Sequence, residues 1–122
     1  MARQLAPSTL ERFRTRLTAE RDRLQALLVE HEQEREEARL SETPAERTPD
    51  PTTAEGGSMA FELEKDLSID ANAEDLLRKV MRALERIEEE TYGICEVCGN
   101  PIPVARLEAL PYATTDVECA RR

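Results

Sequence analysis

The sequence predicts a mainly α-helical protein, with a long antiparallel helical hairpin of the coiled-coil type and a small zinc-ribbon-like lobe at its C-terminal end. Two long stretches lack helix breakers and carry apolar residues in alternating steps of three and four. A segment rich in Pro and Gly separates them, and cysteines spaced like metal ligands follow the second stretch. The composition agrees, since 35% of the residues are charged and only two Phe, two Tyr and no Trp are available for a broad globular core.

The first helix is predicted to begin at Pro7 and Ser8, with Ser8 as the N-cap and Glu11 completing a capping box. No residue breaks it before about Leu40. One face is apolar and follows the a and d positions of a heptad: Leu10, Phe13, Leu17, Leu24 and Leu27, continued by His31 and Ala38.

Residues from about 41 to 58 are predicted to form the loop at the tip of the hairpin, because helix-breaking residues accumulate there: Pro44, Pro49, Pro51, Gly56 and Gly57. A second helix should run from about Met59 to Thr91, with a second start near Ser68 to Asp70 as an option. Its seam is Ala73, Leu77, Val80, Leu84 and Ile87. The predicted domains are therefore the hairpin, residues 1–91, and the lobe, residues 92–122.

Packing the two seams against each other places Phe13 near Leu84 and Leu24 near Leu77. Closer to the loop the seam becomes polar, with His31 and Glu34 opposite the region of Asp66 and Leu63. We expect this part of the hairpin to be the less stable one.

The cysteines predict one zinc ion per chain. Cys95 and Cys98 form a Cys-x-x-Cys pair followed by Gly99, and Cys119 with Asp116 supplies the second half at zinc-ribbon spacing. A zinc ribbon has four Cys ligands, and Asp116 stands where the third of them is expected. The site should therefore hold zinc less tightly than four thiolates would. Two other interpretations remain open: a lobe that folds on its apolar residues with free thiols, and a thiol redox sensor acting through Cys95 and Cys98.

The charge and the motifs argue against several functions. A net charge of -9 disfavours a non-specific grip on nucleic acid, and it favours a basic protein surface or a metal ion as partner. The absence of a leader segment and of a long apolar stretch predicts a cytoplasmic protein without a membrane span. His31 is the only His, and no Ser or Cys nucleophile is recognisably placed for it. The sequence also lacks a Gly-rich phosphate loop and a His-Glu-x-x-His helix. We therefore predict no enzymatic activity.

The loop carries several carboxylates, among them Glu46, Asp50 and Glu55. One interpretation is a solvated turn without further role. The other is a probe, in which two helices carry a carboxylate into a partner's channel that is too narrow for a globular domain, where it meets a metal ion or a basic loop.

Several residues together resemble the zinc-finger signature of the DksA/TraR family: Tyr92-Gly93-Ile94-Cys95-Glu96-Val97-Cys98-Gly99, then Ile102, then Arg106-Leu107-Glu108-Ala109-Leu110-Pro111-Tyr112-Ala113, and finally Cys119. The resemblance implies a bacterial factor that binds RNA polymerase directly and inserts its hairpin tip into the secondary channel near the catalytic magnesium. It implies regulation of transcription without sequence-specific DNA binding, and in better-known members the effects are linked to ppGpp.

The chain departs from the family pattern at three places, one of which is that only three residues follow Cys119, where better-known members continue with a helix. Asp116 replaces the third of four Cys ligands. The family's tip pattern Asp-x-x-Asp-x-Ala keeps its first Asp as Asp50, with Thr53 and Glu55 at the other two positions. By the resemblance, these three residues contact the polymerase. We expect a monomer; the alternative from a different class is a coiled-coil adaptor that binds other proteins and oligomerises.

Overall fold

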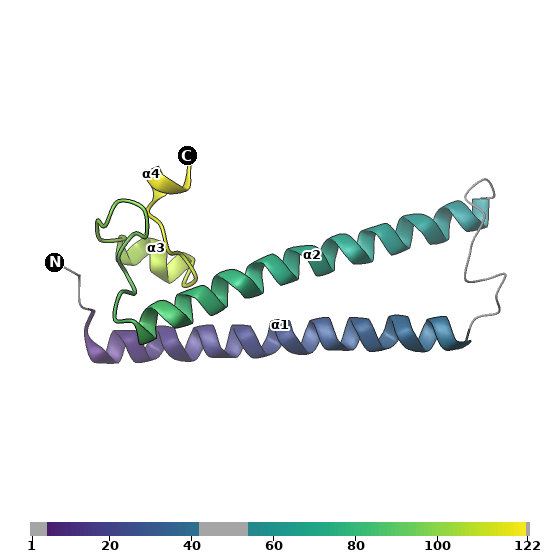
Figure 1. Ribbon diagram of the computed structural model, residues 1–122, viewed down its shortest axis with the longest axis horizontal. Helices are drawn as coiled ribbons and strands as arrows, with labels where there is room; N and C mark the ends of the chain where they lie inside the picture. The colour runs from purple at the N-terminus through teal and green to yellow at the C-terminus, as the bar shows by residue number, and fades with distance from the viewer. Residues whose placement is uncertain (1–4, 42–53, 122) are drawn as a thin grey trace. The chain divides into compact units, whose positions relative to one another are not determined.

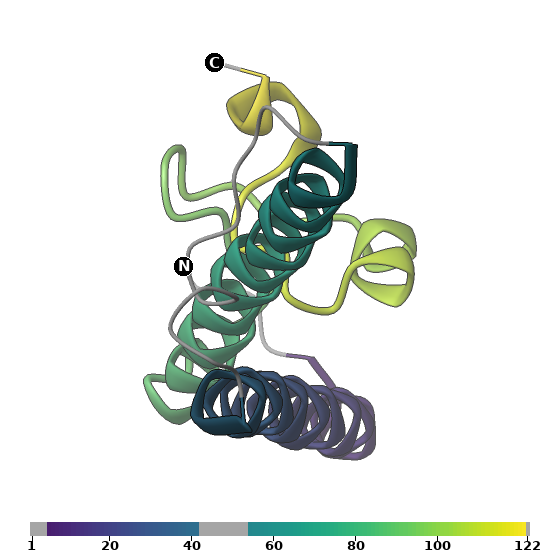
Figure 2. The same cartoon turned by 90° about the vertical axis from the view of Figure 1, so that its right-hand side faces the viewer.

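The computed structural model describes residues 5–41 and 54–121, and these residues are mainly helical, as predicted. Two long helices, α1 (Pro7–Ser41) and α2 (Ala54–Glu88), precede two short ones, α3 (Val104–Ala109) and α4 (Val117–Ala120) (Figure 1). Figure 2 gives a nearly end-on view of the long helices, with α3 and α4 as separate short ribbons. Within the described ranges the only pairing of β type is an isolated bridge between Ile94 and Pro101, and none of the helices is long and apolar enough to cross a membrane.

The internal contacts divide the chain into two units. Unit 1 combines residues 1–23 with residues 76–122, and unit 2 comprises residues 24–75. In each unit a segment of α1 lies antiparallel to a segment of α2. The division near Thr91 between a hairpin and a lobe remains a prediction.

The start of α1 differs from the expected capping box. Pro7 is the first helical residue, and the carbonyl of Ala6 accepts the first hydrogen bond, from the amide of Leu10 at 3.0 Å. Ser8 therefore lies inside the first turn and is not the N-cap. Proline suits this position because its fixed φ matches a helix and its missing N–H would have no partner there.

The second helix begins at Ala54, several residues before the predicted Met59, and it continues without a restart through Ser68. The expected loop boundary at residue 58 was wrong because Gly56 and Gly57 lie within the first turns of α2. A glycine in a helix costs only about 1 kcal/mol relative to alanine, which a 35-residue helix can absorb. Of the predicted tip residues, Asp50 and Thr53 lie outside the described residues, and Glu55 belongs to the first turn of α2.

At its other end α2 stops at Glu88, not at Thr91. Glu90 adopts a left-handed φ of 63°, the amide of Thr91 donates to the carbonyl of Arg86 at 2.9 Å, and the amide of Glu90 donates to that of Ile87 at 3.1 Å. These two bonds form a Schellman motif, which ends a helix and turns the chain. This helix end could not be predicted from the residue types, because glutamate occupies the position where glycine is usual.

The core of unit 1 joins the helical pair to the C-terminal segment. From the helices it takes five buried apolar side chains: Phe13, Leu17, Val80, Ala83 and Ile87. From the segment beyond α2 it takes Tyr92, Cys95, Ile102, Leu107 and Ala113. The ring of Tyr92 packs against that of Phe13 with 5.7 Å between centroids, and the Tyr92 hydroxyl donates to the carbonyl of Pro111 at 2.7 Å. The segment 92–113 is thus packed directly on the helices.

In unit 2 the seam contains a buried carboxylate. Asp70 is 5% exposed, and its two oxygens bind His31 Nδ1 at 2.6 Å and an Arg35 guanidinium nitrogen at 2.5 Å. The predicted seam position of His31 is confirmed, but its partner lies one turn along α2 from the expected Asp66. Burial of a charge requires such paired and hydrogen-bonded neighbours.

This cluster predicts a pH optimum for the stability of unit 2. The hydrogen bond to His31, with Arg35 adding to it, lowers the pKa of Asp70 below its ordinary 3.8, and the same bond raises the pKa of His31 above 6.5. The Asp70 contribution is present above pH 3.8 and is lost as the pH falls further, whereas the His31 contribution is present below pH 6.5 and is lost as the pH rises through its raised pKa. We expect the thermal midpoint to decrease as the pH rises above about 6.5, through the raised pKa of His31. Replacing His31 by Gln should remove that slope in a series of melting curves, and an unchanged slope would assign it to other groups.

Candidate metal centre

Cys95 and Cys98 are held by a tight turn. The amide of Cys95 donates to the carbonyl of Asn100 at 2.8 Å, and the amide of Gly99 donates back to the carbonyl of Cys95 at 3.1 Å. Gly99 has a φ of 76°, a region that residues with a side chain rarely enter. The amide of Val97 points to Cys95 Sγ at 3.4 Å. This turn places both sulfur atoms on one side of the chain.

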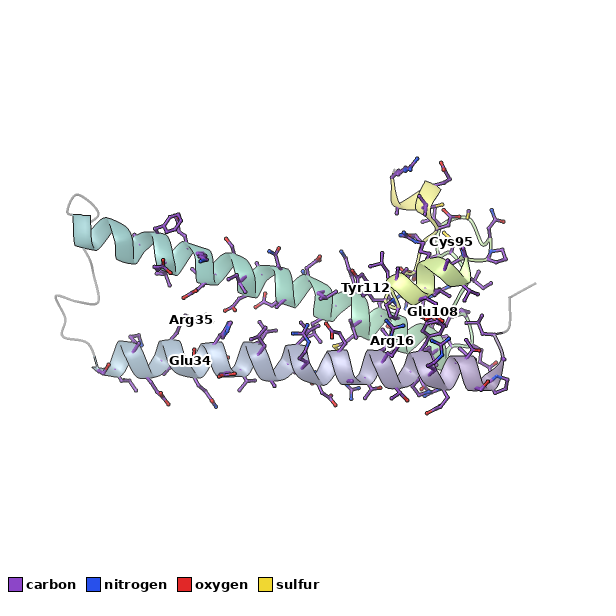
Figure 3. All side chains as sticks on the ribbon, turned by 180° about the vertical axis from the view of Figure 1, so that it is seen from behind. Arg16, Glu34, Arg35, Cys95, Glu108 and Tyr112 are labelled. Carbon is purple, nitrogen blue, oxygen red and sulfur yellow. The ribbon has the colours of Figure 1, made fainter. Side chains whose placement is uncertain are left out.

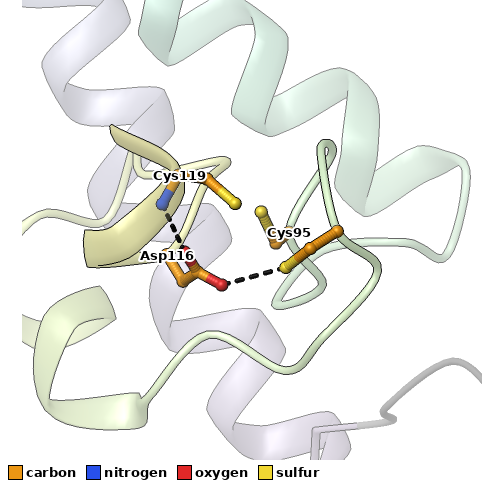
Figure 4. Close-up of side chains that lie close together, drawn as sticks. Cys95, Asp116 and Cys119 are labelled. Carbon is orange, nitrogen blue, oxygen red and sulfur yellow. Dashed lines mark hydrogen bonds between the residues drawn. The ribbon is translucent and has the colours of Figure 1, made fainter. Parts of the chain in front are cut away.

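Asp116 supplies two different oxygens to the second half of the site (Figure 4). Its Oδ1 accepts a hydrogen bond from the amide of Cys119 at 2.8 Å and so caps the N-terminus of α4. Its Oδ2 accepts a hydrogen bond from the thiol of Cys98 at 3.0 Å. Because the cap fixes one oxygen, the other faces the cysteines in a defined orientation.

The four side chains meet at one point and fit a zinc ion. One ligand atom from each of Cys95, Cys98, Asp116 and Cys119 lies within 4.8 Å of all the others. Ligand atoms around a tetrahedral zinc ion lie roughly 3.5–4 Å apart, so small shifts of the side chains bring this group to bonding distance. Three sulfurs and one carboxylate oxygen are ligands that zinc accepts. The predicted composition of the cluster, with Asp in place of one Cys, agrees with this geometry.

The thiols differ in how readily they ionise. Burial opposes ionisation of Cys95, but hydrogen bonds from the backbone of Cys98, Asp116 and Val97 outweigh it and lower its pKa to about 7. Burial raises the pKa of Cys119 to about 12, and the bond to Asp116 raises that of Cys98. Zinc binding would therefore release protons chiefly from Cys98 and Cys119. Cys95 is only 2% exposed, which argues against a freely accessible redox pair.

Two side chains and one backbone amide outside the cluster hold its backbone. One Arg86 nitrogen donates to the carbonyls of Thr91 at 3.0 Å and Ile94 at 2.8 Å, directly before Cys95. Arg106 donates to the carbonyl of Thr115 at 2.9 Å, directly before Asp116. The amide of Glu96 donates to the carbonyl of Thr114 at 2.8 Å and so joins the two halves of the site.

A surface clamp ties α3 to α1. Glu108 accepts from Arg12 at 2.9 Å and lies 3.5 Å from an Arg16 nitrogen, and Figure 3 shows Arg16 and Glu108 facing each other. All three side chains are more than 40% exposed, so each pair contributes at most about 1 kcal/mol. Burial of Leu107 and Ile102 holds this region more strongly.

We expect two substitutions of Asp116 to separate its roles. Asn retains an oxygen for the cap but has no charge for the metal, so Asp116→Asn should lower zinc affinity about 10- to 100-fold while the metal-free protein keeps its stability. Asp116→Ala should lose both the metal ligand and the helix cap. The metal-free Ala variant should therefore be less stable than the metal-free Asn variant by about 1 kcal/mol. Chelator competition and melting of zinc-free protein measure the two effects. Equal metal-free stability of the two variants would contradict the capping role.

The sequence located the four cluster residues but not the side chains that support them. Arg106 and Glu108 belong to the recognised signature, yet no role was assigned to them, and Arg86 looked like any charged residue of an amphipathic helix. The role of Arg86 could have been inferred from its position. It directly precedes the seam residue Ile87, so its side chain lies near the end of the seam.

Comparisons with known proteins agree with this geometry. Residues 90–122 match the prokaryotic dksA/traR C4-type zinc finger. The chain is 52% identical over 58 residues to the uncharacterized protein YteA of Bacillus subtilis, covering 48% of this chain and 24% of that protein. It is 51% identical over 47 residues to the RNA polymerase-binding transcription factor DksA of Caulobacter vibrioides, covering 38% of this chain and 33% of that protein.

Among solved structures, that of the transcription factor DksA2 from Pseudomonas aeruginosa superposes with a TM-score of 0.72 at 28% identity, covering 95% of this chain and 83% of that chain. The two curated sequence matches thus span about a quarter and a third of the relatives' lengths, whereas the structural match extends over nearly all of this chain.

Proposed function

We propose that the chain is a DksA/TraR-type factor that regulates transcription by binding RNA polymerase directly, as a cytoplasmic protein without enzymatic activity; its match to the dksA/traR zinc finger at residues 90–122 and its similarity to DksA proteins support this. The observation that carries this proposal is the four-residue cluster beside antiparallel segments of two long helices, in a chain that matches the dksA/traR zinc finger at residues 90–122 and superposes on the structure of DksA2. The net charge of -9 supports a protein partner and argues against direct reading of DNA.

The finer part of the proposal concerns the secondary channel. The loop between α1 and α2 enters it, with Asp50 as the tip carboxylate and with Thr53 and Glu55 as neighbouring contacts. Support comes from the two 35-residue helices that flank the loop, each about 50 Å long at 1.5 Å per residue. Helices of this length can carry a loop deep into a channel while the cysteine-containing segment docks at its rim.

Zinc has a structural role in this proposal. Held by Cys95, Cys98, Cys119 and Asp116, it would cross-link the turn at Cys95 to α4 and supply folding energy to a segment with few buried residues. The residues around it position the backbone and take no part in any reaction.

The tip assignment is tested by transcription in vitro from a promoter that responds to the wild-type protein. Asp50→Asn should reduce the effect at least about tenfold, since it removes a charge that a metal ion or basic loop would meet, and deletion of residues 44–57 should abolish it. Full activity of both variants would show that the tip assignment is wrong. Arg39→Gln, a change on the exposed surface near the end of α1, is the control and should keep full activity.

The adaptor hypothesis is the second candidate, and exposed apolar residues in unit 2 favour it. An adaptor that oligomerises through its helices would sediment as a dimer or larger species at micromolar concentration, whereas the polymerase-binding protein is expected to be a monomer.

A further inference from the structure

A short stretch of α2 exposes apolar side chains on opposite sides. Phe61, Leu63, Leu67 and Ile69 are 64%, 50%, 49% and 43% exposed. At about 100° per residue, Phe61 and Ile69 lie on one side of the helix, and Leu63 and Leu67 lie on the other, about 180° away. A surface helix normally has one apolar stripe, so this stretch has more apolar surface than one neighbouring helix can cover.

Unit 2 buries little of its own apolar surface. Within its described residues only Leu24 and Ala73 are buried apolar side chains, beside the buried Asp70. Two further large apolar residues of the unit, Val29 and Leu40 on α1, are also more than half exposed. Four large apolar side chains exposed within nine residues of one helix are more than the single scattered ones of an ordinary surface, and they indicate an interaction site.

The charge of the chain is concentrated in the same unit. Residues 24–75 contain 15 acidic and four Lys or Arg residues, a net charge of -11, whereas the residues of unit 1 carry 11 acidic and 13 basic residues, a net charge of +2. Glu62, Glu64 and Asp66 alternate with the apolar residues on α2. A basic surface is the electrostatic complement of this stretch, so we expect the partner that covers it to be basic.

We propose that residues 61–69 of α2 are a docking surface for a basic protein wall with apolar pockets that contacts the helix on two opposite sides. The proposal rests on the proposed function, in that the wall belongs to RNA polymerase, and it adds a contact surface distinct from the tip loop. Apolar contacts on both sides would hold the hairpin in place, while the negative charge of unit 2 would accelerate its approach.

Other occupants fit these observations less well. A second copy of the chain would bring the same -11 charge against this surface and would cover one side only. An anionic lipid surface or nucleic acid would be repelled by it.

The test compares affinity for core RNA polymerase among two double variants and a single control variant. Phe61→Ala with Ile69→Ala removes one apolar side, and Leu63→Ala with Leu67→Ala removes the other. The control, Met81→Ala, removes an apolar residue of α2 in unit 1 that is 49% exposed. Alanine is chosen because it preserves helix formation, which circular dichroism would verify.

Each of the two α2 variants should bind at least about tenfold more weakly than wild type, and the control should bind within about twofold. If only one of the two α2 variants binds more weakly, docking on two sides is contradicted. It is also contradicted if the α2 variants lose no more affinity than the control does. Raising the salt concentration should slow association of the wild type, and a salt-independent rate would contradict a basic wall. If the wild type binds and all variants bind equally, this inference fails while the proposed function stands; if the wild type does not bind, both fail.

Discussion

Replacing Cys95 by Ser is expected to lower zinc affinity by at least about 100-fold and to unfold the segment that follows α2. A structural zinc site contributes roughly 10–16 kcal/mol of apparent binding energy, so each of four ligands accounts for enough to produce such a loss. Cys95 is the most buried ligand of the cluster, and a serine hydroxyl is a much poorer zinc ligand than a thiolate. Chelator competition gives the affinity, and near-ultraviolet circular dichroism of Tyr92 and Tyr112 reports the fold.

Val97→Ala is the matched control, because Val97 lies between the two ligands and its side chain is 63% exposed. It should leave zinc affinity within about twofold of wild type, as expected for a surface change away from special features. Stoichiometric zinc with unchanged affinity in Cys95→Ser would contradict the ligand assignment. A metal-free protein that melts cooperatively at the same temperature as the zinc form would show that apolar residues alone hold the segment.

Replacing Arg86 by Met is expected to reduce the free energy of unfolding by about 2 kcal/mol. The change removes a donor from the carbonyls of Thr91 and Ile94; the Thr91 carbonyl keeps its bond from the amide of Ile94 at 3.2 Å, whereas the Ile94 carbonyl loses the donor that holds it, at a cost of about 1–3 kcal/mol. The Arg86 side chain is 11% exposed, so water cannot easily replace it. Methionine fills a similar volume, which keeps the packing against the core. Urea denaturation measures the loss.

Zinc affinity should fall in the same variant, by about 10- to 100-fold, because the Ile94 carbonyl that Arg86 holds directly precedes Cys95. Arg82→Met is the control: Arg82 also bonds Glu96 but is 39% exposed, and its loss should cost less than about 1 kcal/mol. Equal destabilisation by the two substitutions would show that the buried hydrogen bonds of Arg86 contribute no more to the free energy of unfolding than the exposed ion pairs of Arg82.

The helical seam was largely predictable from the spacing of apolar residues. Phe13, Leu17, Val80 and Ile87 are buried as the heptad indicated, since a repeat of 3.5 residues leaves one face of a helix for its partner. Leu84 is only half-buried, and Ala83 takes its place in the core. Near the end of the seam, the heptad pattern does not predict which of two neighbouring residues, Ala83 or Leu84, is buried.

Helix ends were less predictable because they depend on single backbone conformations. Gly56 and Gly57 were interpreted as breakers, yet α2 includes them, and Glu90 adopts the left-handed conformation usual for glycine. In both cases the surrounding helix and its packing override the preference of one residue.

The metal cluster was predictable because ligand spacing along the chain follows directly from tetrahedral geometry. Asp116 was expected as a ligand, but its second role as the cap of α4 depends on a four-residue helix that composition does not reveal. The pairing of His31 with Asp70 could not be predicted, because it depends on the register of the two helices. A shift of one helical turn changes the partner from Asp66 to Asp70.

The central claim, that the hairpin of this protein inserts into the secondary channel of RNA polymerase, is tested most directly by a competition measurement. Purified protein carrying a fluorescent label near Asp50 is titrated with core polymerase, with and without a factor known to occupy the secondary channel. We expect binding at micromolar concentration or better and its loss as the competitor is added. Binding that the competitor leaves unchanged would place the protein elsewhere on the polymerase, and no binding at all would contradict the proposed function.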